Sequence, residues 1–249
     1  MQIVYKMKRV FLVLVLMVFF SVHEIEAQEE SVNKVELEAG FDLATSYLWR
    51  GFEIGDGPVV QPWMSVSYGG FSLGAWGTSN VVGDSKEVDL YASYSVKNFT
   101  LTLTDYFAMG SPGLDPDFFN FAGHQSNHIA ELELSYGGSD QFPLTLSGGF
   151  FVYGLALDPN GDDAGKLNHS TYFELGYPGS IKEYDYQLFA GFVPTESSFY
   201  ETEKFSFINV GCKVSKNIPI TAQFSVPTSI TLATSPERRA FCITAMCSF

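Results

Sequence analysis

Apolar and polar residues alternate with a period of two along most of this chain, and this alternation limits it to an all-β fold. Beyond residue 30 no stretch carries an apolar stripe with the 3.6-residue period of a helix. Successive side chains of a strand point to opposite faces, so each alternating segment needs one apolar and one polar environment. The pattern predicts twelve strands, over residues 34–50, 58–68, 70–79, 86–97, 98–108, 127–137, 142–157, 168–178, 182–194, 204–215, 218–228 and 238–249.

The connections between these segments alternate between short and long. The short ones are residues 69–70, 97–98, 137–141, 179–181 and 216–217, and the long ones are 52–57, 81–85, 109–126, 158–167, 194–203 and 228–237. This sorting is typical of outer-membrane barrels, which have short periplasmic turns, long extracellular loops and an even number of strands. We therefore expect a single antiparallel transmembrane β-barrel, whose strands approach the ~9–11 residues needed to cross a bilayer.

Residues 1–27 have the pattern of a secretory signal peptide. Lys6, Lys8 and Arg9 precede an apolar run over residues 10–22, and Ala27 precedes a polar stretch. The run is shorter than the ~20 residues that a transmembrane helix requires. We expect export across the inner membrane, an N-terminal extension over 28–33 and a barrel domain over 34–249.

Composition excludes several classes of function. The chain carries 28 acidic and 14 basic residues, a net charge of -14, so nucleic acid is excluded as a partner because its phosphates require basic patches. The 23 Phe and 13 Tyr residues exclude a disordered chain. Cys212, Cys242 and Cys247 are not spaced as a disulfide scaffold or a zinc site. We expect no metal and no cofactor.

If the apolar faces meet lipid, the opposite faces line a lumen rich in carboxylates. Arg50 and Arg238 are the basic residues that strand parity assigns to the lumen, and Arg50 is placed to clamp Glu87 or Asp89. Carboxylates opposite a guanidinium would create a transverse field that small cationic or polar solutes must cross. The residues predicted to line the constriction are Arg50, Trp76, Glu87, Asp89, Tyr91, Glu131 and Glu133.

This pattern favours a passive, porin-like channel rather than an enzyme. We expect an integral protein in the outer membrane of a diderm bacterium. Its partners would be outer-membrane lipid, lipopolysaccharide, the periplasmic chaperones and the barrel-assembly machinery. The sequence does not fix the oligomeric state.

Two motifs in the first third of the mature chain carry a family resemblance. The first, at residues 46–51, reads Ser-Tyr-Leu-Trp-Arg-Gly, and the second, at residues 74–77, reads Gly-Ala-Trp-Gly; residues 87–91 follow as Glu-Val-Asp-Leu-Tyr. The chain thereby resembles the TorF-like porin family, a group of outer-membrane proteins of largely uncharacterised role. The terminal aromatic Phe249 is similar to the C-terminal signature of outer-membrane barrels. The resemblance implies an exported barrel that acts as a porin, and it supplies no substrate and no catalytic residues.

Three alternatives remain open on the sequence. His124 and Ser126 lie two residues apart, so they share a strand face, and Asn127 follows; this element is similar to that of outer-membrane lipid esterases. A soluble, secreted β protein could instead bind glycans through Trp49, Trp63 and Trp76. The carboxylates of the lumen could also pair with Arg50 and plug a purely structural barrel.

Overall fold

The computed structural model describes residues 34–83, 85–109, 117–121, 126–154 and 170–249. The predicted signal peptide at 1–27, the extension at 28–33 and His124 lie outside this part of the chain. No helix among the described residues is long and apolar enough to cross a membrane. The strands are β1 (Glu36–Ala44), β2 (Tyr47–Trp49), β3 (Phe52–Ile54), β4 (Val59–Tyr68), β5 (Phe71–Asn80), β6 (Lys86–Val96), β7 (Phe99–Met109), β8 (His128–Tyr136), β9 (Thr145–Gly154), β10 (Thr171–Ile181), β11 (Tyr184–Val193), β12 (Ser206–Pro219), β13 (Ser225–Ser235) and β14 (Ala240–Ser248).

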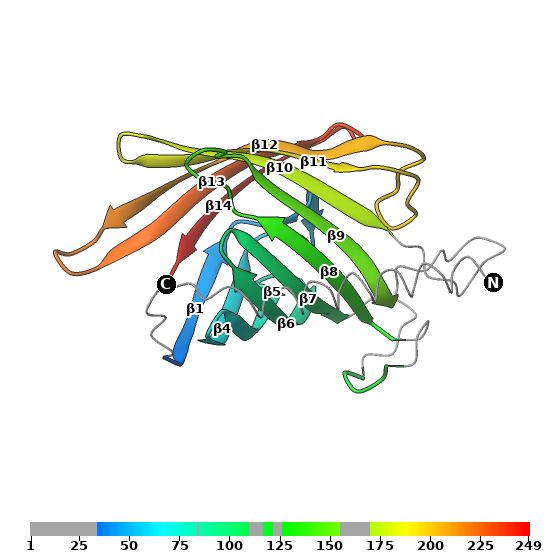
Figure 1. Ribbon diagram of the computed structural model, residues 1–249, viewed down its shortest axis with the longest axis horizontal. Coiled ribbons are helices and arrows are strands. Elements are labelled where there is room, and N and C mark those ends of the chain that lie inside the picture. Colours follow the sequence, from blue (N-terminus) through cyan, green and yellow to red (C-terminus); the bar gives the residue numbers. More distant parts are fainter. Residues whose placement is uncertain (1–33, 84, 110–116, 122–125, 155–169) are drawn as a thin grey trace, which may run out of the picture. The chain divides into compact units, whose positions relative to one another are not determined.

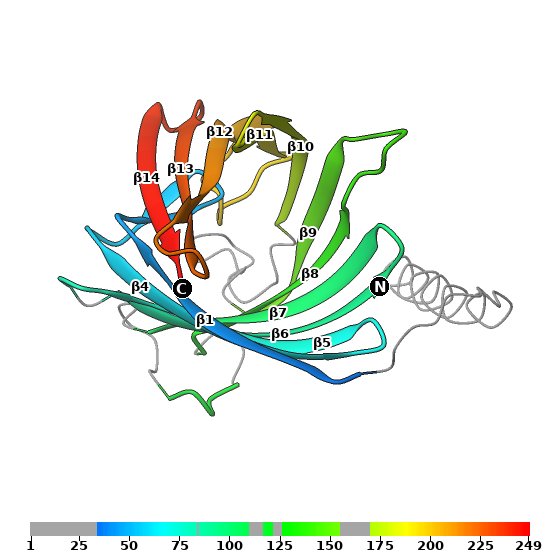
Figure 2. The same ribbon diagram turned by 90° about the vertical axis from the view of Figure 1, so that its left-hand side faces the viewer.

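Twelve of these strands form one closed antiparallel barrel, which confirms the predicted fold. Each strand pairs with its neighbour in the chain, β4 pairs with β1, and β14 closes the ring against β1. Figures 1 and 2 show β1 and β4–β7 on one side of the barrel and β10–β14 on the other. The remaining two strands, β2 and β3, form a separate hairpin between β1 and β4.

The two faces of the barrel wall follow the alternation of the sequence. On β7, Phe99, Leu101 and Leu103 are exposed on the outer face, whereas Thr100 and Thr102 on the inner face are partly buried. The same exposure of large apolar side chains recurs around the ring, on β1, β4, β5, β10 and β12–β14. Contiguous apolar patches on soluble monomers rarely exceed a few hundred Å². The exterior is therefore suited to hydrocarbon, and the polar residues face inward.

The connections lie on two rims, and several depart from the prediction. Residues 179–181, predicted as a turn, continue the ladder of β10 against β11, and the chain reverses at 182–183. The predicted turn at Lys216-Asn217 is wrong, because both residues continue the ladder of β12 against β13. The chain reverses instead at 220–224, where the amides of Ile220 and Thr221 both donate to Phe224 O. The strand predicted at 218–228 is consequently shifted to Ser225–Ser235, and the loop predicted at 228–237 shrinks to residues 236–239.

We call the rim with connections 69–70, 97–98, 137–144, 182–183 and 220–224 the short-turn rim, and the opposite one the long-loop rim. The seam that closes the barrel lies between β1 and β14 and is short. Its register covers Asp42 to Ala44, and the amides and carbonyls of Phe41 and Phe249 extend it with two hydrogen bonds of 3.0 and 2.9 Å. The two rings also stack at 5.2 Å. By contrast, β12 and β13 pair over ten residues.

Candidate functional site

The candidate site is built on a hairpin that turns away from the barrel wall. The strand predicted over 34–50 is wrong beyond Ala44, where β1 ends, and the predicted loop at 52–57 contains β3. β2 and β3 pair around Arg50 and Gly51, whose φ angles of 48° and 80° are those of a type I′ turn. A Cβ at Gly51 would lie 2.0 Å from Ile208 O, so glycine also allows the turn to approach β12 closely.

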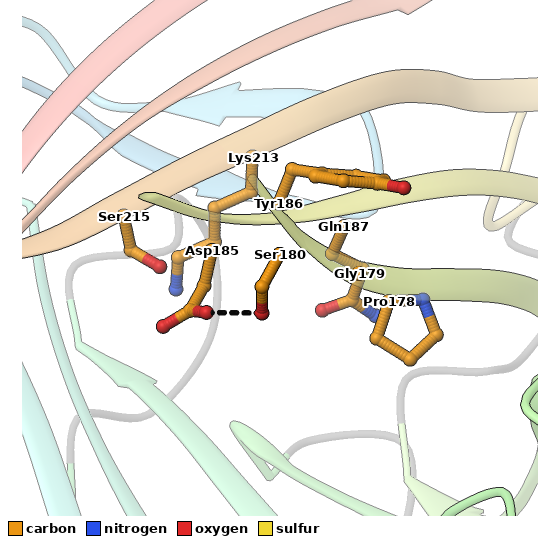
Figure 3. Close-up of a pocket in the computed structure, with 8 residues that line it drawn as sticks. All are labelled: Pro178, Gly179, Ser180, Asp185, Tyr186, Gln187, Lys213 and Ser215. Atoms are coloured by element: carbon orange, nitrogen blue, oxygen red, sulfur yellow. Dashed lines mark hydrogen bonds between the residues drawn. The ribbon is translucent and has the colours of Figure 1, made fainter. Parts of the chain in front are cut away.

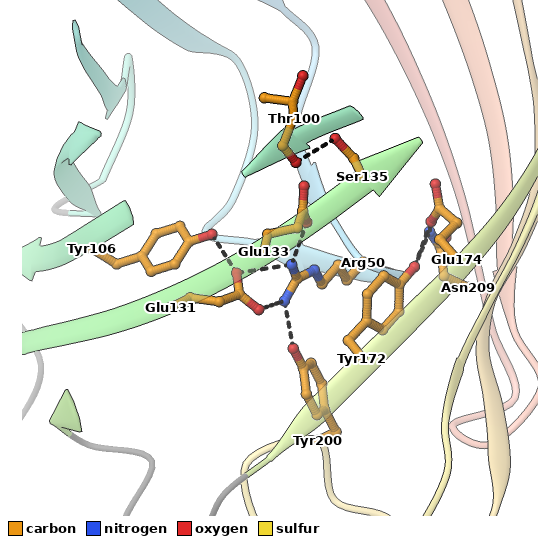
Figure 4. Close-up of polar contacts among 10 residues, drawn as sticks. All are labelled: Arg50, Thr100, Tyr106, Glu131, Glu133, Ser135, Tyr172, Glu174, Tyr200 and Asn209. Atoms are coloured by element: carbon orange, nitrogen blue, oxygen red, sulfur yellow. Dashed lines mark hydrogen bonds and ion pairs between the residues drawn. The ribbon is translucent and has the colours of Figure 1, made fainter. Parts of the chain in front are cut away.

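The turn carries Arg50 to the inner face of β8, on which Glu131 and Glu133 lie (Figure 4). Arg50 Nη1 and Nη2 donate to the two carboxylate oxygens of Glu131 at 2.7 and 2.9 Å, and Nη2 donates to Glu133 at 3.3 Å. Nη1 also donates to the Tyr200 hydroxyl at 2.7 Å. The side chains of Arg50 and Glu131 are only 9% and 2% exposed. Loss of either partner of such a buried, bidentate pair is costly, because the other charge would be left buried and unpaired.

Aromatic rings complete the environment of the guanidinium. The rings of Trp49 and Tyr172 lie 4.8 and 4.5 Å from it, within the range of cation–π attraction. Burial alone would lower the pKa of Arg50, but Tyr200 and Glu131 outweigh this effect and hold the pKa well above its ordinary value. Burial raises the pKa of Tyr200, and Arg50 opposes this only in part. Arg50 is therefore always charged, and the Tyr200 phenol remains neutral.

Tyr200 belongs to the connection between β11 and β12, which folds onto the hairpin. Its side chain is fully buried and stacks on Trp49 at 6.3 Å and on Phe151 at 6.1 Å. Such aromatic pairs contribute about 0.5–1.5 kcal/mol beyond the area they bury. Within the same connection, Ser197 and Thr202 form an isolated antiparallel bridge. We call the β2–β3 hairpin together with residues 195–203 the plug.

A second arginine ties the two parts of the plug together. Arg238 lies in the turn between β13 and β14, and not on the strand where the sequence placed it. Its Nη2 donates to Tyr200 O at 3.1 Å and its Nε donates to Glu201 at 3.2 Å. Its guanidinium also lies over the ring of Phe52, 3.1 Å from the centroid. Arg238 thus contacts both the hairpin and the 195–203 segment at the long-loop rim.

The other residues predicted for the constriction lie on β5 and β6, and all but one adjoin the plug. Tyr47 of the hairpin donates to Glu87 at 3.1 Å, and its ring lies 5.3 Å from Trp76. Trp76 pairs in register with Asp89. The predicted clamp between Arg50 and Glu87 or Asp89 is therefore wrong, because Tyr47 occupies Glu87 while Arg50 reaches β8. Tyr91 lies apart, with its ring against the backbone of Gly74 on β5.

Two adjoining cavities lie in the lumen between the plug and the short-turn rim. The inner one, of about 200 Å³, contacts the plug and is lined by Leu48, Arg50, Glu174, Gln187, Phe189, Asn209, Lys213 and Thr231. The outer one, of about 420 Å³, shares Gln187 and Lys213 with it and reaches residues 178–180 near the short-turn rim (Figure 3). Among the described residues, no group of three or more His, Cys, Asp or Glu side chains could hold a metal ion.

Lys213 corrects the predicted charge of the lumen. The sequence assigned only Arg50 and Arg238 to the inner face as basic residues. Lys213 pairs in register with Gln187 and Thr231, and it lines both cavities. The inner face of the strands therefore carries a basic residue that the sequence did not assign to it, whereas Arg238 lies in a turn.

His124, the base of the predicted esterase element, lies outside the described residues, so its pairing with Ser126 stays a prediction. His128 lies on the outer face, with Nδ1 2.9 Å from Asp105 and Nε2 2.7 Å from Phe118 O. Ser126 Oγ accepts a hydrogen bond from the His128 backbone amide at 3.0 Å. Both ring nitrogens of His128 are therefore engaged by groups other than Ser126. His128 is therefore not placed to take the proton of Ser126.

Sequence reasoning missed several residues of the site, chiefly Tyr47, Tyr172, Tyr200, Asn209, Lys213 and Tyr106, which donates to Glu131 Oε2 at 2.8 Å. For Tyr200 a weak signal was present, since Phe199 and Tyr200 are adjacent aromatics in an otherwise polar connection. For the hairpin, the signal was a glycine between two short alternating segments, although Arg-Gly is not one of the favoured dipeptides of a type I′ turn.

Comparisons with protein-family models, with curated proteins and with solved structures give no match to this chain. The fold and the geometry of the lumen are thus the grounds on which a function can be argued.

Proposed function

We propose that this protein is an outer-membrane channel for small polar or cationic solutes, and that the plug keeps its lumen closed at rest. The observation that carries the proposal is the position of Arg50. Its buried guanidinium joins the plug to β8 at Glu131 and Glu133, while cavities extend from that point toward the short-turn rim. Loss of the guanidinium would remove these hydrogen bonds between the hairpin and β8.

The barrel supports the membrane location. A closed ring of strands pairs its backbone groups without water, which a spanning structure requires in hydrocarbon. The exposed apolar side chains on the outer face supply the matching surface. In outer-membrane barrels the short turns are periplasmic. By that rule the cavities open to the periplasm and the plug lies in the extracellular half of the lumen.

The charges of the lumen support a preference for cations. Glu87, Asp89 and Glu133 face inward, and Glu174 and Asp185 line the cavities. Against these carboxylates the inner face offers Arg50, which is already paired, and Lys213. In a narrow pore with low-dielectric walls, the surplus of negative charge attracts cations and repels anions. The resemblance of the 46–51 and 74–77 motifs to the TorF-like porin family is in keeping with this function.

The test is planar-bilayer conductance of the refolded full chain with Arg50→Ala beside the wild type. We expect low or intermittent conductance for the wild type and a larger, cation-selective conductance for Arg50→Ala. Selectivity is read from the reversal potential in a salt gradient. Heat-modifiable migration in electrophoresis shows that each sample is a folded barrel.

Two results would contradict the proposal. A folded Arg50→Ala barrel that stays closed would indicate a permanently plugged, structural barrel. A conductance carried mainly by anions would contradict the assignment of the lumen charges.

A further inference from the structure

The inner cavity separates charge along its length. Glu174 on β10 and Asn209 on β12 lie level with each other, because both pair with Gly191 of β11. Lys213 and its register partner Gln187 lie four residues further along β12, about 13 Å away at ~3.3 Å per residue. All four side chains line the same cavity of about 200 Å³. The cavity therefore has a carboxylate near one end and an ammonium group near the other; Arg50, which also lines it, is already paired with Glu131 and Glu133.

Asn209 leaves a buried acceptor in this cavity. Its side chain is 7% exposed, and its Nδ2 donates to Glu174 at 3.0 Å and to the Tyr172 hydroxyl at 3.1 Å (Figure 4). The amide orientation is fixed by Glu174, since a carboxylate can only accept from the nitrogen. Asn209 Oδ1 consequently points away from Glu174, and no described residue donates a hydrogen bond to it. This oxygen has almost no accessible surface, so the part that Asn209 plays at the cavity is to hold Glu174 in place through its amide nitrogen.

Lys213 provides a positive charge at the other end of the cavity from Glu174. No ion pair joins it to a carboxylate among the described residues, whereas Asp185 in the adjoining cavity accepts a hydrogen bond from Ser180 at 2.6 Å (Figure 3). Lys213 is only partly exposed and lines both cavities. An ammonium group in this position can bind an anionic group that enters from the short-turn rim.

We infer that the cavity is a binding site for a small zwitterion such as a free α-amino acid. The ligand's ammonium group would donate to Glu174, which Asn209 Nδ2 holds in place, and its carboxylate would accept from Lys213. This inference rests on the proposed channel function, because the zwitterion is the class of polar solute that the channel would take up. The size of the cavity, about 200 Å³, agrees with such a ligand, since the pockets of drug-sized molecules have roughly 300–1,000 Å³ and a free amino acid is smaller.

The test is calorimetric titration of the refolded full chain in detergent with three related probes. L-alanine carries both charges, L-alanine methyl ester keeps only the ammonium group, and N-acetyl-L-alanine keeps only the carboxylate. We expect L-alanine to bind at least about tenfold more tightly than either derivative, because each derivative loses a hydrogen bond to a charged group.

Three variants locate the site. Lys213→Gln should weaken L-alanine and N-acetyl-L-alanine about tenfold or more and leave the methyl ester unchanged. Asn209→Ala should weaken L-alanine and the methyl ester and leave N-acetyl-L-alanine unchanged. Lys216→Gln is the matched control: this lysine lies three residues away on the outer face of the same strand, bound to Glu183 at 3.1 Å. It should bind all three probes as the wild type does.

Three results would overturn the inference. The first is no binding of L-alanine to a folded wild-type barrel. The second is equal binding of one derivative, which would indicate a plain anion or cation site. The third is equal loss of affinity in Lys213→Gln and Lys216→Gln.

Conductance separates this inference from the channel proposal. Binding of L-alanine without any conductance in Arg50→Ala would contradict only the channel proposal. Conductance in Arg50→Ala without binding of L-alanine would contradict only the zwitterion site.

Discussion

Gly149 gives the sharpest way to disturb the plug without touching its charged groups. Gly149 lies on β9 opposite Glu133, facing the lumen. A Cβ built on it would lie 2.1 Å from Glu131 Oε1 and 3.0 Å from Arg50 Nη2. No carbon can approach a carboxylate oxygen that closely, so in Gly149→Ala the Glu131 side chain must move away. The Arg50–Glu131 pair would then be broken, although both residues remain in the chain.

The size of the effect follows from the burial of the pair. Displacing one partner of a buried ion pair costs about 3–5 kcal/mol. The backbone entropy that alanine removes belongs to the unfolded chain, so it does not enter the balance between the closed and the released plug of a folded barrel. A loss of about 3–5 kcal/mol shifts that balance by roughly 150- to 5,000-fold.

The assay compares the open probability in planar bilayers of Gly149→Ala, the wild type and Gly137→Ala. Gly137 is a matched control because a Cβ there would meet nothing closer than 3.8 Å. We expect a higher open probability for Gly149→Ala and wild-type behaviour for Gly137→Ala. If Gly149→Ala were folded and behaved as the wild type while Arg50→Ala opened the channel, the collision argument would be refuted.

Two further predictions concern the wall and its faces. Glu131→Gln should open the channel much more than Glu133→Gln. The Glu131 side chain is 2% exposed and bidentate, whereas Glu133 is 33% exposed and contributes at most about 1 kcal/mol after solvent screening. Equal conductance in the two variants would argue against the Arg50–Glu131 clamp. The faces can be tested by cysteine labelling after the three native cysteines are replaced by alanine. In lipid vesicles a membrane-impermeant maleimide should label Ser215→Cys and leave Val214→Cys unlabelled. The reason is that Ser215 lines a lumen cavity, whereas Val214 is on the outer face. The reverse labelling pattern would contradict the assignment of lipid to the outer face and of solvent to the inner face.

The number and the faces of the barrel strands could be predicted because alternation is a local property of the chain. Each strand carries its own apolar and polar face, so β7 can be assigned from residues 98–108 alone. The shift of β13 could not be predicted in this way. Residues 216–219 and 225–227 fit a strand or a turn equally well, and their pairing with one another decides the matter.

The plug could not be predicted because its contacts join distant parts of the chain. Arg50 and Glu131 are 81 residues apart, and Arg50 and Tyr200 are 150 apart. The sequence placed Arg50 on the inner side and named Glu131 and Glu133 as its neighbours in the constriction. It also favoured Glu87 and Asp89 as the clamp, because parity alone does not say how far a short hairpin can carry a side chain across the lumen.

The brevity of the seam gives the plug a mechanical role. β1 and β14 share only a few ladder positions, so the ring is held least firmly where its first and last strands meet. The hairpin that leaves β1 is anchored through Arg50 on β8 and lies against β12, so it acts as a strut across the cylinder. Without the hairpin, the strands of the wall should begin to separate at the seam, between Phe41 and Phe249.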